Sequence, residues 1–111
     1  MCPFNPIKGK TVTSHSLRIL HRIRTLVTAG RYTIGAHAER HMLEEGFEKE
    51  HCIGAILDGR VIEHYEARRT CLISGLFHVG PRTLCRLHVV CDYSQAQAID
   101  IVTAFIPTPL R

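Results

Sequence analysis

Hydrophobic and polar positions change their spacing once along this chain, close to Gly59. Before that glycine, apolar residues recur every three or four positions, which is the period of an α-helix; after it, they alternate with polar residues as in a β-strand. Helices are therefore predicted over residues 14–30, 36–45 and 47–58. Strands are predicted over residues 60–65, 70–75, 83–91 and 98–106.

The links between the predicted strands are short, and this decides how the strands pair. Parallel neighbours need a crossover of about a dozen residues or more, whereas hairpins need only a few. We therefore predict an α+β domain in which two to three N-terminal helices pack on one face of a four-stranded antiparallel meander sheet. Everything before Gly59 is predicted to be helix or loop.

The ends and the overall composition predict one small soluble domain. Residues 1–13 show no periodicity and are predicted to be a flexible arm, so that the domain spans residues 14–111. No apolar run approaches the roughly 18 residues of a membrane span, and the N-terminus lacks the apolar core of a secretory signal. The predicted location is the cytoplasm, with no membrane partner.

Five cysteines are present, an odd number with no C-x-x-C pair. Neither a disulfide framework nor a zinc ribbon fits this pattern. Four of them, Cys52, Cys71, Cys85 and Cys91, lie in apolar stretches. We expect the cysteines to be reduced and to pack as small apolar residues.

Residues 36–45 hold the densest polar chemistry in the chain. At about 100° per residue, a helix over this range brings two imidazoles, a guanidinium and a carboxylate within roughly 100° of arc. These side chains belong to His37, Arg40, His41 and Glu44. The opposite side is apolar and is expected to dock on the core through Ala36, Ala38, Met42 and Leu43.

The predicted strand 83–91 alternates cleanly. One face carries Cys85, Leu87, Val89 and Cys91, and the other carries Leu84, Arg86, His88 and Val90. Arg86 and His88 therefore share a face. In the last strand, simple alternation places Thr103 and Phe105 on the same side as Ile99 and Ile101.

Charge points to a polyanionic partner. The net charge is +4 with histidines neutral, the pI is about 9.0, and there are eight histidines. On the predicted first helix, Arg18 and Arg22 share a basic face, with Arg24 nearby. We predict that these arginines, together with Arg40, bind RNA; an ordinary solvated helix face is the alternative.

A series of short motifs, in this order and spacing, resembles the bacterial domain-of-unknown-function family four-two-five-eight over about residues 31–107. The motifs are His37-Ala38, Met42, Gly46, Asp58-Gly59-Arg-Val-Ile62-Glu63-His-Tyr65, Cys71-Leu-Ile-Ser-Gly75, Leu87-His88-Val-Val90 and Ile101-Val-Thr103-Ala-Phe105-Ile-Pro107. The resemblance implies a fold of the RelE and barnase kind. It also implies a toxin-type domain proposed to cleave RNA without a metal, with an antitoxin protein as a partner.

Three positions depart from the family pattern. Its helix motif, H-A-x-x-R-M-x-x-R-G, has arginines where this chain has His41 and Glu45. Its terminal T-x-Y-x-P has a tyrosine where this chain has Phe105. These changes leave the implied fold intact and keep open a second reading, a catalytically diverged module that binds RNA or a protein.

Metal-independent RNA cleavage needs a base, an acid and a cation that stabilises the charged phosphorane. We predict His37 and His88 as the acid/base pair, with Arg40 and Arg86 holding the phosphate. Thr103 would donate a hydrogen bond. His41 would be a further acid/base group or a phosphate contact, and no cofactor is expected.

A zinc site is a third reading. His37 and His41 are four residues apart, the spacing of helical zinc ligands. The intervening residues do not form H-E-x-x-H, so no glutamate occupies the metalloprotease position. Further ligands would have to come from Glu44, His51, His64, His78 or His88.

Overall fold

The structure, a computed structural model, describes residues 13–107. The helices are α1 (Ser14–Thr28), α2 (Ala36–Glu45) and α3 (Lys49–Asp58), with a short 3-10 helix η1 (Glu66–Arg68). The strands are β1 (Tyr32–Ile34), β2 (Arg60–Tyr65), β3 (Thr70–Gly80), β4 (Thr83–Asp92) and β5 (Ile99–Phe105). The predicted N-terminal arm lies outside the described residues, apart from Thr13, which caps α1. None of the helices between residues 13 and 107 is long and apolar enough to cross a membrane.

The sheet has five strands in the order β1-β5-β4-β3-β2. The α+β class is confirmed, and strands β2 to β5 pair with one another in antiparallel fashion in chain order. The prediction of four strands, with only helix or loop before Gly59, is wrong because β1 pairs in parallel with β5. Three residues are too few to show an alternating pattern, so β1 gave no periodic signal.

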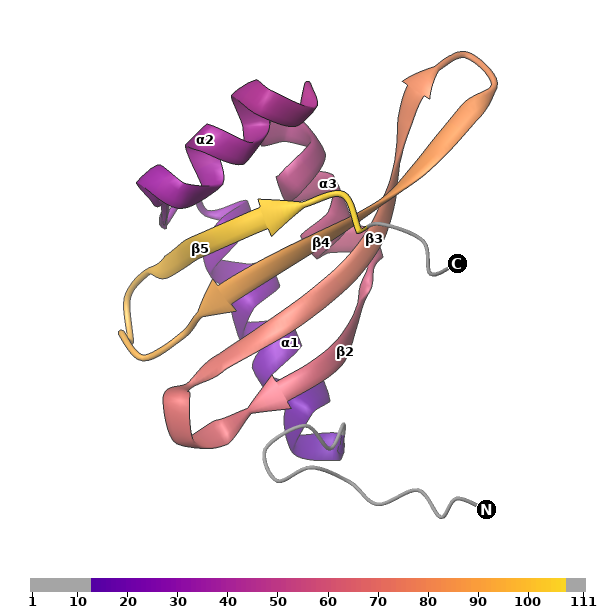
Figure 1. Cartoon of the computed structure of the whole chain (residues 1–111). Coiled ribbons are helices and arrows are strands. Elements are labelled where there is room, and N and C mark those ends of the chain that lie inside the picture. The colour runs from indigo at the N-terminus through magenta and orange to yellow at the C-terminus, as the bar shows by residue number, and fades with distance from the viewer. Residues whose placement is uncertain (1–12, 108–111) are drawn as a thin grey trace.

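The two faces of the sheet differ in what covers them. Helices α1 and α3 lie behind the sheet in Figure 1, and we call the face they cover the helix face. Fully buried side chains fill this layer, among them Ile23, Ile56, Ile73, Val89 and Ile101. The opposite side, here called the open face, is turned toward the viewer and carries no helix among the described residues. Helix α2 lies alongside β5, so the prediction that all helices cover one face holds for α1 and α3 only.

Helix α3 approaches β3 unusually closely at Gly75. A Cβ atom on Gly75 would lie 2.6 Å from the Cα atom of Ala55, which is closer than real Cβ contacts allow. Glycine is therefore required at this position for steric reasons, not for backbone flexibility. The close approach fixes the height of α3 above the sheet.

A bulge in β5 reverses the predicted side-chain directions. The register between β4 and β5 shifts between the pairs Val90↔Thr103 and Cys91↔Ile101. An extra residue in one strand reverses the side-chain directions of all later residues in that strand, relative to simple alternation. Ile101 therefore points into the helix face, whereas Thr103 and Phe105 lie on the open face with His88, and their predicted grouping with Ile101 is wrong.

A buried polar network joins α1 to the sheet. The ring of His64 contacts Ser16 Oγ through Nδ1 at 2.8 Å and the hydroxyl of Tyr93 through Nε2 at 2.6 Å. The His64 side chain is 2% exposed. Burial lowers its pKa below the ordinary value, and the charge of His15 lowers it further against the opposing effect of Glu66.

Stability should therefore fall as the solution becomes acidic. Between the lowered pKa of folded His64 and the ordinary 6.5, the unfolded chain binds more protons, so the free energy of unfolding decreases as the pH drops through this window. Thermal unfolding should give a lower Tm at about pH 5.5 than at about pH 7.5. In His64→Gln, the Tm should fall less between these two pH values. Part of the remaining fall comes from His88, because its pKa is lowered too. An undiminished drop in the variant would contradict this assignment.

The cysteines behave as predicted in the part of the chain that the structure describes. Cys52, Cys71 and Cys91 are buried, and Cys85 is partly buried; all four are free thiols. Burial raises the pKa of Cys52 to about 11 and that of Cys71 to about 12. These thiols are protonated at neutral pH and act as apolar core residues.

Candidate functional site

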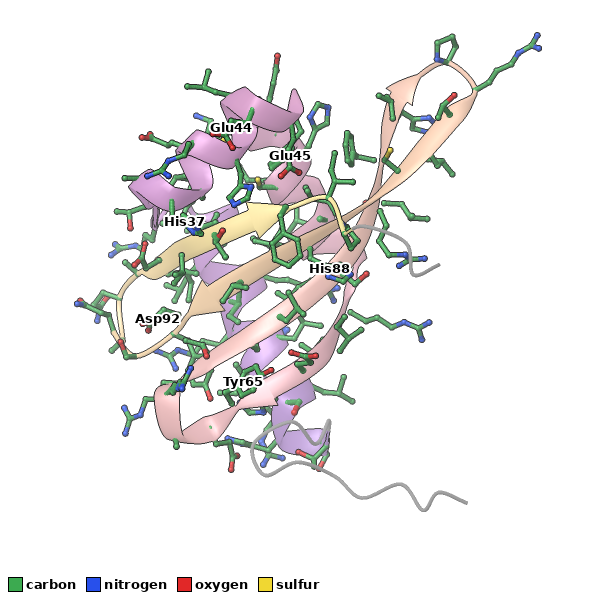
Figure 2. The ribbon with its side chains drawn as sticks, viewed as in Figure 1. His37, Glu44, Glu45, Tyr65, His88 and Asp92 are labelled. Carbon is green, nitrogen blue, oxygen red and sulfur yellow. The ribbon has the colours of Figure 1, made fainter. Side chains whose placement is uncertain are left out.

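An open groove of about 600 Å³ lies on the open face, where α2 meets the sheet. Its walls come from helix α2, from strands β2 to β5 and from the two residues just after β5. Its lining residues are His41, Glu45, Ile62, Glu63, Leu72, His88, Phe105, Ile106 and Pro107. Figure 2 shows Glu45 on α2 and His88 on β4, on either side of the end of β5.

Glu45 links the helix side of the groove to the end of the sheet. One carboxylate oxygen contacts Nδ1 of His41, one helical turn earlier, at 2.7 Å. The other accepts a hydrogen bond from the backbone N–H of Ile106 at 2.7 Å. The carboxylate of Glu45 therefore orients the imidazole of His41 and also connects α2 to the residue that follows β5. With Nδ1 engaged, Nε2 is the ring atom of His41 that remains for a substrate.

The ring of Phe105 lies near both imidazoles of the groove. Its ring centroid is 6.3 Å from that of His41 and 5.5 Å from that of His88. The contact with His88 follows from strand pairing, since Phe105 and His88 are direct neighbours across β5 and β4. The β5 bulge is what brings the aromatic ring to this face.

The surroundings of His88 favour its neutral form. Burial lowers its pKa below the ordinary value, and the positive charge of Arg86 lowers it further, while Glu63 acts in the opposite direction. The ring is therefore neutral at pH 7 and can accept a proton. Glu63 lies on β2, across β3 from His88, and its carboxylate accepts a hydrogen bond from the hydroxyl of Tyr65.

The groove takes its helical imidazole from His41, whereas His37 was predicted to pair with His88. His37 is exposed and lies one turn away, with its ring centroid 4.9 Å from that of His41. It does not line the groove. Arg40, predicted to hold the phosphate, is exposed and also lies outside the groove.

The rotation of α2 explains this difference. The helix docks through Ala38, which is fully buried, and through Met42, which packs on the core. Leu43, predicted to be on the docking side, is 87% exposed. With this orientation, His41 and Glu45 turn toward the sheet and the remaining polar side chains face solvent.

Arg86 and Thr103 lie on the open face, outside the groove itself. Arg86 donates a hydrogen bond to Ser74 Oγ at 2.9 Å and borders a second hollow of about 470 Å³. It stands two residues before His88 on the same strand face. The hydroxyl oxygen of Thr103 is covered and has no hydrogen-bond partner among the described residues, so it does not face a substrate in this arrangement.

Two of the three arginines of α1 have structural contacts, and all three are remote from the groove. Arg22 donates to the backbone carbonyls of Tyr93 and Gln95, and its guanidinium lies over the Tyr93 ring. Arg24 donates to the carbonyls of Ile56 and Gly59 at 2.8 and 2.5 Å. Arg18 is exposed. Because α1 covers the helix face, these side chains cannot share a substrate pocket with His88.

A third hollow, of about 410 Å³, lies near the N-terminal half of α1. It is lined by His15, Ile19, Arg22, Glu66, Arg69, Tyr93, Ser94 and Ala96. Several of these groups already have partners: His15 pairs with Glu66 at 3.2 Å, and Arg22 holds the carbonyls described above. The groove at His41 and His88 is the stronger candidate because it brings two imidazoles together, whereas this hollow is lined by one.

The two acidic residues of the groove, Glu45 and Glu63, were not among the site residues predicted from the sequence. Glu45 is four residues after His41, a spacing that puts the two side chains together on any helix. The sequence indicates the position of Glu63 less clearly: it lies two residues before Tyr65, so both side chains point to the same face of β2. For the zinc hypothesis, the described residues contain no group of three or more His, Cys, Asp or Glu side chains arranged to hold a metal ion.

Comparison with known proteins assigns the family. No match to the chain was found among curated proteins or among solved structures. One family model matches residues 34–106, from the end of β1 to just past β5. This range contains every lining residue of the groove except Pro107 and excludes α1. The chain belongs to the family described as "Domain of unknown function (DUF4258)".

Proposed function

We propose that the chain is a toxin-type endoribonuclease that cleaves RNA without a metal, through the imidazoles of His41 and His88. The observation that carries the proposal is that both rings line one open groove and each lies near the ring of Phe105. One ring is held by a carboxylate, and the other has a lowered pKa. Two imidazoles in different surroundings suit an acid and a base that act on one phosphate.

The proposed reaction assigns one proton transfer to each ring. His88, neutral at pH 7, takes the proton of the RNA 2′-hydroxyl. The 2′-oxygen attacks the adjacent phosphorus, and the bond from phosphorus to the 5′-oxygen breaks. His41, oriented by Glu45, gives a proton to the leaving 5′-oxygen. The products are a 2′,3′-cyclic phosphate and a free 5′-hydroxyl.

Arg86 is proposed as the cation that attracts the phosphate. It lies on the same strand face as His88 and is close enough to lower the pKa of that ring. Its guanidinium keeps further N–H donors beyond the one engaged by Ser74. A guanidinium beside the groove stabilises charge on the phosphorane oxygens.

The RelE and barnase likeness, a cytoplasmic location and an antitoxin partner belong to the same proposal. The fold likeness and the antitoxin partner rest on the sequence resemblance, together with an uncovered sheet face that carries the groove. The location is proposed from the sequence, in which no apolar run reaches the length of a membrane span, and none of the described helices is long and apolar enough to cross one. A second function is favoured by one residue: the aromatic position of the family pattern is Phe105, which has no hydroxyl. A diverged module of this kind would bind RNA or a protein and leave it intact.

Incubation of the full chain with mixed-sequence RNA in excess chelator separates these functions. The proposal predicts cleavage in chelator and binding that weakens as salt rises, because phosphate contacts release counterions. Binding without cleavage would favour the diverged module. Absence of both at low ionic strength would remove RNA as the ligand.

A further inference from the structure

Strands β3 and β4 continue beyond the rest of the sheet as a hairpin arm, here residues 76–86. The arm projects at the upper right of Figure 1. The last pair between β2 and β3 is Arg60↔Ser74, and the last pair between β4 and β5 is His88↔Phe105. Among the described residues, the arm therefore has two strands with no third neighbour on either edge. Such a ribbon is marginal in water by itself.

One face of the arm is anchored and the other is bare. On the helix face, the Phe77 ring packs at 4.7 Å from His51 and 6.3 Å from Phe47, measured between centroids. On the arm and its tip, Leu76, Val79 and Leu84 are 48, 58 and 54% exposed. Three large aliphatic side chains in so short a segment form an apolar patch of the kind that marks protein-binding surfaces.

The charges on the arm are of one sign. Residues 76–86 contain Arg82 and Arg86 and no acidic residue. The hollow at the base of the arm adds Arg60 and a single carboxylate, Asp58. A second copy of this chain would therefore meet like charges, whereas an acidic segment would be complementary.

We propose that the hairpin arm binds an extended, acidic segment of a second protein, which adds to the free edge of β3 beside Leu76–Gly80. The backbone of the segment satisfies the unpaired edge. Leu76, Leu84 and Arg86 all lie on the open face of the arm. Apolar side chains on that face of the segment cover Leu76 and reach toward Leu84, and carboxylates on the same face reach Arg86. The exposed aliphatic residues favour a protein over RNA, which would need aromatic side chains for base stacking. The proposal is independent of RNA cleavage.

Selection from a displayed library of random peptides of about ten residues tests the proposal, because this length spans a strand. The full chain is the target. The arm should enrich peptides that carry apolar and acidic residues together on one strand face, at positions i and i+2. Hydrogen exchange with an enriched peptide should show new protection at residues 76–80. Affinity should fall as salt rises.

The matched variants are Leu76→Glu with Leu84→Glu in the arm and Leu43→Glu on the outer surface of α2. All three positions are exposed, and thermal unfolding confirms that each variant folds. The arm variant should lose at least about tenfold in peptide affinity, and Leu43→Glu should lose none. Equal binding to the arm variant, no enrichment of acidic peptides, or self-association of the unmodified chain through the arm would overturn the proposal. Binding of single-stranded RNA that depends on Leu76 and Leu84 would overturn it as well.

Discussion

Replacing His88 with alanine is expected to lower the rate of RNA cleavage by about 10²–10⁴-fold, the usual contribution of general acid–base catalysis. His41→Ala should give a loss of the same order, because each imidazole serves one of the two proton transfers. Rates are measured in excess chelator with a labelled RNA. Thermal unfolding of each variant checks that the fold is kept, since both side chains are only partly buried.

His37→Ala and His21→Ala are the matched controls. His37 lies one turn from His41 outside the groove, and His21 is exposed on α1. Both should retain cleavage within a few-fold of the unmodified chain. If His37→Ala were as damaging as His88→Ala while His41→Ala had no effect, the pair predicted from sequence would replace the pair assigned from geometry.

Gly75→Ala is expected to lower the free energy of unfolding by about 1–3 kcal/mol, the cost typical of overpacking. The added methyl would press against the backbone of α3 at Ala55, which cannot move without shifting the whole helix. Denaturant unfolding measures this change as a lower midpoint concentration of denaturant, with the m-value unchanged.

Gly54→Ala provides the opposite control within α3. A Cβ at Gly54 meets nothing within 4 Å, so no clash opposes the better helix propensity of alanine. This variant should gain about 0.5–1 kcal/mol. A destabilised Gly54→Ala together with an unchanged Gly75→Ala would show that the described approach of α3 to β3 is wrong.

The spacing of apolar residues correctly predicted those helices and strands that bury one side along most of their length. Helices α1 and α3 and strands β2 and β4 have long runs of alternating or helical pattern, and their positions agree with the structure to within a few residues. Strand β1 is too short for such a run. The outer part of β3 was missed for a different reason: in the arm most side chains are exposed, so burial imposes little pattern on residues 76–80.

The candidate site could be predicted only where it depends on local geometry. The face of His88 follows from alternation along β4 alone. The face of Phe105 depends on a bulge that no pattern in β5 reveals. The choice between His37 and His41 depends on the rotation of α2, which is set by contacts of Ala38 and Met42 with the rest of the fold. Tertiary packing therefore decides which imidazole enters the groove.

The most direct test of the central claim compares an unmodified RNA with the same sequence carrying 2′-O-methyl groups throughout, both in excess chelator. If His88 takes a proton from the 2′-hydroxyl, the unmodified RNA is cut to products that end in 2′,3′-cyclic phosphate, and the methylated RNA is bound but stays intact. Cleavage of both RNAs would contradict the mechanism. An unmodified RNA that is bound and remains uncut would contradict the assignment of catalysis to this groove.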